Sequence, residues 1–249
     1  MKRAWYLGVT AEEIAPRCIL VGDPGRVDRF AARLDGARLV SQERGLRTVT
    51  GEYEGTPVTV SAFGMGAPIA AVVLEELAGV GARVVLRAGT AMAVGDDANL
   101  LGALVLARAA FRGESTSVTY APLGYPAVAD PLLLAAAQVE LRRSGAPYRE
   151  GLLASYDGFY TELFAVDERR KREVVARFAE LAALGILAAD METSAVLVAG
   201  ALLGIRAGSL CLVSVDGRRG TRLDEAARRA GEDALVDVTL TTVTATQID

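Results

Sequence analysis

Three arginines of this sequence stand where an anion can be bound. Arg26 ends the turn at 22–26, which follows an apolar run and offers backbone N–H groups as well. Arg87 lies inside the apolar run VVLRAGT, where an arginine is costly to bury without an anionic partner. Arg44 lies in the turn-rich segment SQERGLRT. Three converging arginines would hold one phosphate through charge-assisted, bidentate hydrogen bonds.

Each arginine also has an ordinary structural interpretation. The turn at 22–26 contains Asp-Pro-Gly, a common turn tripeptide that can simply connect a strand to a helix. Arg87 can form a structural salt bridge, and Arg44 can be an exposed surface residue. The residue types alone leave both interpretations open at each position.

Two carboxylates follow a further apolar run, at 185–189. Asp190 and Glu192 flank Met191 at the expected start of a helix. A carboxylate such as Glu192 can accept hydrogen bonds from two neighbouring hydroxyl groups, which is the geometry that a ribose offers. Asp190 is placed either to cap the helix or to contact a ligand.

The aromatic segment SYDGFY, at 155–160, lies beside a predicted loop. Its rings, including that of Phe159, can stack on a planar base, or they can belong to the core and its rim. The segment therefore indicates a base-binding surface only in combination with the charged residues.

The amino-acid composition excludes several kinds of catalysis and binding. The chain has no histidine, which removes Ser-His-Asp and Cys-His catalysis and the commonest zinc ligand. A net charge of −4 argues against a nucleic-acid surface. Asp190 and Glu192 interrupt the most apolar run, so we expect no membrane span; without a signal peptide we expect a cytoplasmic protein. Cys18 and Cys211 lie in apolar runs and are expected as reduced core thiols.

Strands and helices that alternate along the chain must position these residues. Apolar, β-branched runs predict strands at 18–22, 56–63, 82–89, 103–111, 185–189 and 207–215. Apolar residues at helical spacing predict helices at 67–79, 131–144, 167–184, 191–203 and 224–247. The alternation predicts one α/β domain over residues 1–249, with a mostly parallel sheet covered by helices. Ligands of such sheets bind where strands end, and the polar residues above follow their strands.

Together these segments resemble the nucleoside phosphorylase family that includes uridine phosphorylase and the hexameric bacterial purine nucleoside phosphorylases. The matching segments follow the family's order along nearly the whole chain: YLGVT, LVGDPGRV, RG, GMGAP followed by EEL, LRAGTAMAV, YAPLGYPAVADP, SYDGFY, DMETSA and LVSVDGR. YLGVT and APLGYPAVAD favour the uridine phosphorylase branch. The resemblance implies a mixed, mostly parallel central sheet flanked by helices, and homodimers that assemble into hexamers.

The resemblance also implies an activity and its residues. The substrates are a nucleoside and inorganic phosphate, which attacks the anomeric carbon without a metal or another cofactor; the protein, Arg87 included, contributes positioning and electrostatic stabilisation. The implied phosphate site consists of Gly22, Arg26, Arg87 and Thr90, completed by Arg44 of a neighbouring subunit. The implied ribose site consists of Tyr6, Met191 and Glu192, and the base packs against Phe159.

Several positions depart from the family pattern. Tyr6 replaces a histidine that reaches a neighbour's 5′-hydroxyl, and Ile69 replaces a serine after GMGxP. Leu163 and Ala165 replace the Gln-x-Arg pair that reads uracil, so pyrimidine recognition loses its polar groups. The choice between purine and pyrimidine bases is therefore open.

The position of the general acid is also altered. The purine branch places this acid directly after Val-Ser, where this sequence has Val215, with Asp216 one residue later. A local bulge would let Asp216 protonate the leaving base; otherwise the enzyme depends on bases that are stable as anions. Phosphorolysis is the leading hypothesis, because all three arginines are present. The alternatives are a nucleosidase that uses water and a nucleoside-binding protein without catalysis.

Overall fold

The computed structural model describes residues 3–97 and 99–248, which build a nine-stranded mixed sheet. The strands are β1 (Arg17–Val21), β2 (Asp35–Ser41), β3 (Thr48–Tyr53), β4 (Thr56–Ala62), β5 (Val84–Ala93), β6 (Leu104–Arg112), β7 (Tyr148–Ser155), β8 (Ile186–Asp190) and β9 (Arg206–Asp216). The helices are α1 (Pro24–Ala31), α2 (Ala67–Gly79), α3 (Ser117–Tyr120), α4 (Pro131–Ser144), α5 (Glu168–Ala183), α6 (Thr193–Leu202) and α7 (Glu225–Ala245), with short helical turns η1 (Glu43–Gly45) and η2 (Phe159–Leu163).

The second half of the sheet closes on itself. The strand order is β2-β3-β4-β1-β5-β8-β7-β6-β9, and β5 also pairs with β9, so five strands form a ring. Small and aliphatic side chains fill the ring, among them Val105, Leu153 and Cys211. Cys18 and Cys211 are both free and buried, as predicted, and burial raises the pKa of Cys18 to about 12. This thiol is therefore inert at neutral pH.

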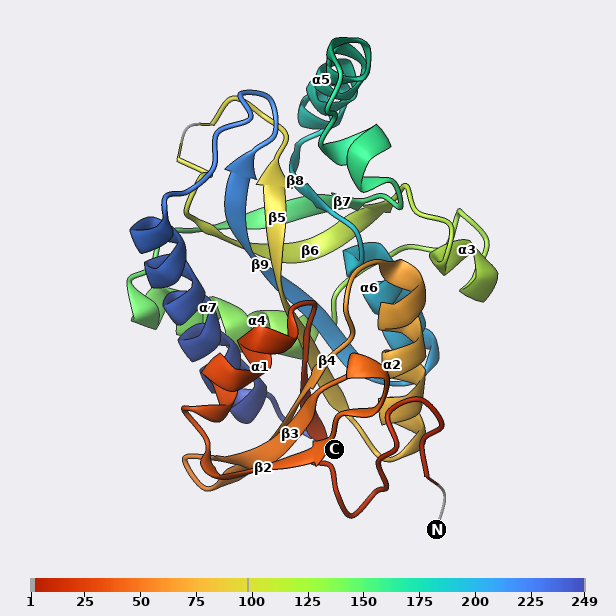
Figure 1. Ribbon diagram of the computed structural model, residues 1–249, viewed down its shortest axis with the longest axis vertical. Helices are drawn as coiled ribbons and strands as arrows, with labels where there is room; N and C mark the ends of the chain where they lie inside the picture. Colours follow the sequence, from red (N-terminus) through yellow and green to blue (C-terminus); the bar gives the residue numbers. More distant parts are fainter. Residues whose placement is uncertain (1–2, 98, 249) are drawn as a thin grey trace.

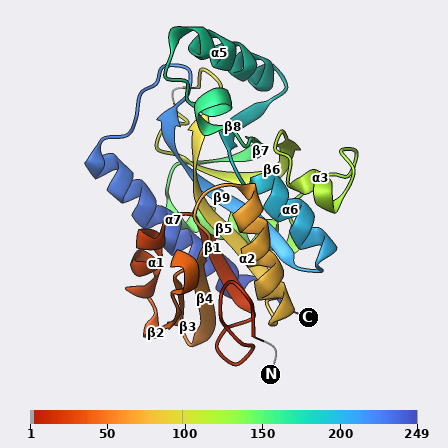
Figure 2. The same cartoon turned by 45° about the vertical axis from the view of Figure 1, so that its right-hand side comes forward.

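Helices cover both faces of the sheet (Figures 1 and 2). On one face α1, α4 and α7 bury an apolar cluster that includes Phe30, Leu133 and Leu240. On the other face α2 and α6 pack together through Leu74 and Val196. The apolar faces of these helices are thus buried against the sheet. This packing fixes the position of the loops at the edge of the sheet.

The structure confirms the predicted fold class and corrects some of its parts. Among the described residues five strand pairings are parallel and four antiparallel, so the sheet is mixed. The sequence analysis did not predict β2, β3 and β7. β2 is an edge strand with mostly exposed side chains, and β7 begins with the polar residues YREG. Neither shows the apolar run that marks a buried strand.

The last helix forms although its end is rich in β-branched residues. α7 ends at Ala245, two residues before the predicted end at 247. Val236, Thr239 and Val243 are buried in this helix, so packing outweighs their weak helix propensity. No helix within residues 3–97 and 99–248 combines the length and the apolar character that crossing a membrane requires.

Candidate active site

A cavity of about 690 Å³ opens where β1, β5, β8 and β9 end. β1 stops at Val21, next to the middle of β5, so the turn that follows β1 lies beside the second half of β5. Such a point, where neighbouring strands part, is where open α/β sheets bind ligands. Seven of the ten residues predicted from the sequence line this pocket: Gly22, Arg26, Arg87, Thr90, Phe159, Met191 and Glu192.

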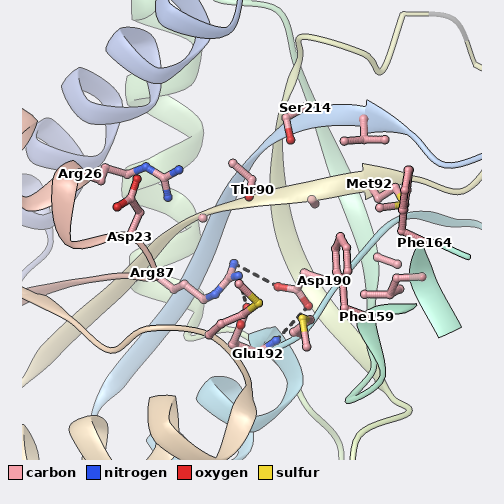
Figure 3. A pocket seen from close by; sticks show the side chains of 18 of the residues that line it. Asp23, Arg26, Arg87, Thr90, Met92, Phe159, Phe164, Asp190, Glu192 and Ser214 are labelled. Atoms are coloured by element: carbon pink, nitrogen blue, oxygen red, sulfur yellow. Dashed lines mark hydrogen bonds and ion pairs between the residues drawn. The ribbon is translucent and has the colours of Figure 1, made fainter. Parts of the chain in front are cut away.

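The pocket has two chemically different ends (Figure 3). Arg26, Asp23 and Thr90 lie toward one end, and Phe159 and Phe164 lie at the other. Arg87, Asp190 and Glu192 come together beneath the space between them. The pocket can therefore hold a ligand that is anionic at one end and planar at the other.

Arg87 is fixed by ion pairs in the floor of the pocket. Its side chain is buried, its Nη1 lies 3.0 Å from Oδ2 of Asp190, and its Nη2 pairs with Glu192. Nη1 also lies 2.8 Å from Sγ of Cys211. A Cβ at Gly89 would overlap the guanidinium, so the absence of a side chain at Gly89 makes room for Arg87 in this position. The salt bridge considered as an alternative is therefore present, and it aligns Arg87 with the carboxylate predicted for the sugar.

Arg26 faces the same space from the start of α1. Asp23 caps this helix by accepting a hydrogen bond from the Gly25 N–H at 2.8 Å, so the turn also has the structural role. Arg26 donates to the Ala88 carbonyl at 3.2 Å and lies 3.6 Å from Glu232. Burial, aided by repulsion from Arg87, lowers the pKa of Arg26.

Each of the two guanidinium groups contains one buried donor without a partner. The Nε atoms of Arg26 and Arg87 are buried and have no hydrogen-bond partner in the described part of the chain. A buried donor without a partner costs free energy, and it costs more when the group is charged. An anion bound between the two arginines would offset the repulsion between their charges.

The two carboxylates have different roles. Asp190 accepts hydrogen bonds from Ser155 Oγ at 2.6 Å and from the Thr193 backbone N–H at 3.2 Å, at the start of α6. It therefore holds the helix and Arg87, which was the capping alternative. Glu192 accepts from the Gly66 N–H at 2.7 Å through Oε1, and from Arg87 through Oε2. Each oxygen of Glu192 keeps a lone pair for a hydroxyl group.

Burial raises the pKa of Glu192. The charge of Asp190 acts in the same direction, whereas Arg87 acts against it. One guanidinium is shared by two buried carboxylates, so it does not offset the desolvation of both. Gly66, which also orients Glu192, has a φ of 100°, a conformation that favours glycine.

The end opposite Arg26, here called the aromatic end, is formed by Met92, Phe159, Leu163, Phe164, Val215 and Arg222. Phe159 and Phe164 stack with their ring centroids 6.0 Å apart, and the guanidinium carbon of Arg222 lies 4.9 Å from the Phe164 ring centroid. Sequence analysis did not identify Phe164, Arg222 or Arg228, which also lines the pocket. The two arginines lie in the basic segment 218–229, which is typical of a solvated surface.

Asp216 is not among the described residues that line the pocket. The bulge that would let it act as an acid is present: Ala91 pairs with Val213 and Met92 with Val215, which leaves Ser214 as the extra residue of β9. The bulge does not turn the Asp216 carboxylate into the pocket. Its Oδ1 accepts from the backbone N–H groups of Arg218 and Arg219, at 3.1 and 2.9 Å, and its Oδ2 pairs with the Arg219 side chain. Asp216 is therefore the cap of a turn.

Tyr6 and Arg44 do not line the pocket of their own chain, as far as residues 3–97 and 99–248 describe it. They lie together, with the Arg44 guanidinium carbon 4.7 Å from the Tyr6 ring centroid. Arg44 also has a positive φ of 53°, which is unusual outside glycine. Their action on a neighbouring subunit stays a prediction.

Fold and pocket together define a class: an α/β enzyme with a single mixed sheet, whose pocket joins an arginine-rich end to an aromatic end. Residues 16–244 match the sequence model of the Phosphorylase superfamily. The chain belongs to this superfamily, and this confirms the resemblance seen in the sequence.

Individual relatives agree with this assignment. The chain is 34% identical over 224 residues to a uridine phosphorylase from Thermococcus kodakarensis, a match that covers 84% of the chain and 76% of the relative. It is 32% identical to a guanosine phosphorylase from Halorubrum lacusprofundi, covering 98% of the chain and all of the relative. A crystal structure of uridine phosphorylase from Vibrio fischeri superposes with a TM-score of 0.87 at 30% identity, covering 98% of this chain and 97% of the other.

Proposed function

We propose that this protein is a nucleoside phosphorylase that cleaves ribonucleosides to a free base and ribose 1-phosphate. One observation carries the proposal: two buried guanidinium groups with unpartnered Nε donors lie in one pocket with Glu192, and Glu192 is paired with one of them. Relatives named uridine phosphorylase and guanosine phosphorylase support it. Because they differ in base, they leave the choice of base open.

Phosphate would bind at the arginine end. Arg26 and Arg87 donate to its oxygens, Thr90 adds a hydroxyl, and Gly22 allows close approach because it has no side chain. The position of Gly22 is already tight, since a Cβ there would lie 2.9 Å from the Gly64 carbonyl oxygen. The arginines hold the nucleophile in line with the anomeric carbon, which removes most of the entropy loss of a bimolecular step.

The sugar lies between the two ends, with its 2′- and 3′-hydroxyls on Glu192 and its ring against Met191. As the bond from the anomeric carbon to the base nitrogen breaks, its electron pair moves onto the base. A phosphate oxygen then forms the new bond to the same carbon. The positive charge that develops on the sugar is stabilised by the phosphate and by Glu192, without a covalent intermediate on the protein.

A panel of uridine, cytidine, guanosine, inosine and adenosine, incubated with and without phosphate, tests the proposal. We expect base release that requires phosphate, with one equivalent of ribose 1-phosphate formed for each base. Phosphate-independent release of free ribose would identify a nucleosidase instead. Nucleoside binding without base release would identify a binding protein.

Oligomerisation supplies a second test, because we propose that Arg44 and Tyr6 complete a neighbour's pocket in a homodimer, with hexamers built from such dimers. Arg44→Ala should raise the KM for phosphate about 10- to 100-fold, the loss of one charged hydrogen bond. At a phosphate concentration near the wild-type KM, where Arg44→Ala chains alone are nearly inactive, co-expression with Glu192→Gln chains should then restore activity. Random pairing makes about half of the dimers mixed, and each has one intact site, so about a quarter of wild-type activity returns.

The outcome depends on where Arg44 acts. If Arg44 served the pocket of its own chain, both sites of every mixed dimer would be damaged and activity would not return. Sizing of each sample by light scattering separates this result from failed assembly.

Asp216→Asn tests the structural role of Asp216. The amide oxygen of asparagine can still accept the N–H groups of Arg218 and Arg219, so the turn is kept. We expect kcat for base release within about threefold of wild type, whereas loss of a general acid lowers the rate about 100- to 10,000-fold. Steady-state kinetics with the best nucleoside of the panel distinguishes the two results.

A further inference from the structure

The chain beyond β9 folds back as a hairpin over the aromatic end of the pocket. The Asp216 N–H donates to the Thr221 carbonyl at 2.8 Å, and the Leu223 N–H donates to the Ser214 carbonyl at 3.1 Å. Val215 and Arg222 are therefore directly opposite each other on the two arms of the hairpin. The Asp216 carboxylate caps its tip.

This hairpin brings Arg222 to the pocket. The Arg222 guanidinium lies over Phe164, which in turn stacks on Phe159. A guanidinium over the face of an aromatic ring is attracted by the electrons of the ring, which holds Arg222 beside the two phenylalanines. Arg222 therefore brings N–H donors to the end of the pocket where a planar ligand would lie against the same aromatic pair.

Arg222 is the one charged or polar side chain of the aromatic end as defined above. The other members are two phenylalanines, a leucine, a valine and a methionine, which pack together and contact a base without distinguishing its edges. A guanidinium donates hydrogen bonds and cannot accept them. A carbonyl oxygen matches this edge, whereas an exocyclic amino group places donor against donor.

We propose that Arg222 determines base specificity: its guanidinium donates to a ring carbonyl oxygen, so the enzyme selects oxo bases over amino bases. This inference rests on the proposed phosphorolysis. When the bond to the sugar breaks, the electron pair received by the base is delocalised onto that carbonyl oxygen. Arg222 stabilises this negative charge, and so it favours departure of the base as an anion where Asp216 supplies no proton.

Matched substrate pairs test the proposal. Inosine and adenosine differ by an oxo or amino group at one ring carbon, and so do uridine and cytidine. We expect wild type to favour the oxo member of the pair it uses by at least about tenfold in kcat/KM. Arg222→Leu should lower kcat/KM for the oxo member about 10- to 100-fold and leave the amino member within about threefold, so that the preference disappears.

Two further variants control for charge and for the hairpin. Arg222→Lys keeps the charge without the planar donor pair and should fall between wild type and Arg222→Leu. Arg229→Leu removes an equal charge from an exposed arginine that pairs with Glu225, and should behave as wild type. Asp216→Ala removes the cap of the hairpin and should reduce the oxo preference, whereas Asp216→Asn should keep it.

Failure of this inference is distinguishable from failure of the proposed function. Base release with an unchanged oxo preference in Arg222→Leu would overturn the role of Arg222 and leave phosphorolysis standing. Calorimetric binding of hypoxanthine against adenine, and of uracil against cytosine, reads the base subsite without catalysis. A wild type that binds the oxo bases more tightly through Arg222 but releases no base would overturn phosphorolysis alone.

Discussion

Arg87→Ala is expected to lower kcat/KM for phosphate at least about 1000-fold. The variant lacks the charged group that donates hydrogen bonds to the phosphate, and it lacks the ion pair that positions Glu192. The sequence alone predicts an intact fold for this variant. The structure changes that expectation, because Arg87 is the shared partner of two buried carboxylates, Asp190 and Glu192. Removing one partner of a buried ion pair costs about 3–5 kcal/mol of stability.

The loss of stability in Arg87→Ala is expected to depend on pH, with a sign that follows from the pKa of Glu192. Burial already raises the pKa of Glu192, and removal of Arg87 raises it further. The folded variant then binds a proton more tightly than its unfolded chain, so folding is favoured as the pH falls through the raised pKa. Urea unfolding at several pH values should therefore show the largest deficit relative to wild type near neutral pH and a smaller one in acid.

Arg87→Lys separates the two effects, because lysine keeps the charge between the carboxylates but lacks the planar fork for phosphate. It should retain most of the stability and still lose phosphate affinity. Arg83→Ala, which removes an exposed arginine directly before β5, should change neither property. Full phosphate-dependent turnover by Arg87→Ala would show that phosphate binds elsewhere.

Much of this fold could be predicted from local sequence, because buried strands and amphipathic helices leave periodic patterns. β1, β5 and β9 each contain a mostly apolar run, since both of their faces are covered. β2 and β7 escaped prediction because their positions depend on neighbouring strands and not on their own composition. The closure of five strands into a ring is likewise a tertiary property that no single segment encodes.

In the site, too, some residues could be predicted from local sequence and others depend on tertiary structure. Arg87 and Glu192 could be predicted because charged residues next to buried strands need partners, and each proved to be the partner of the other. Arg222 could not be predicted, because its place depends on a hairpin whose turn is capped by Asp216. The residue type of Asp216 suggested an acid, whereas its backbone neighbours determine that it is a cap.

Glu192→Gln is expected to lower kcat/KM for ribonucleosides about 100- to 10,000-fold, the combined loss of two hydroxyl hydrogen bonds to a charged acceptor. Glutamine can still accept the Gly66 N–H, so the loop stays in place. Free bases carry no sugar, and their binding constants, measured by calorimetry, should change by less than about threefold. Glu225→Gln, on the exposed start of α7, is the matched control.

Deoxynucleosides test whether the loss of activity in Glu192→Gln comes from lost contacts with the hydroxyl groups of the sugar. Wild type should use 2′- and 3′-deoxynucleosides poorly. Glu192→Gln should discriminate little between deoxynucleosides and ribonucleosides, because the residue that binds the missing hydroxyl group is already a weaker acceptor in this variant.

The pH dependence of kcat/KM tests the role of Glu192 independently. Wild-type activity needs ionised Glu192, whose pKa burial raises, so kcat/KM should fall at a pH above the ordinary glutamate value of about 4.3. The acid limb should be absent from Glu192→Gln, and equal losses for free base and nucleoside would count against a sugar-binding role.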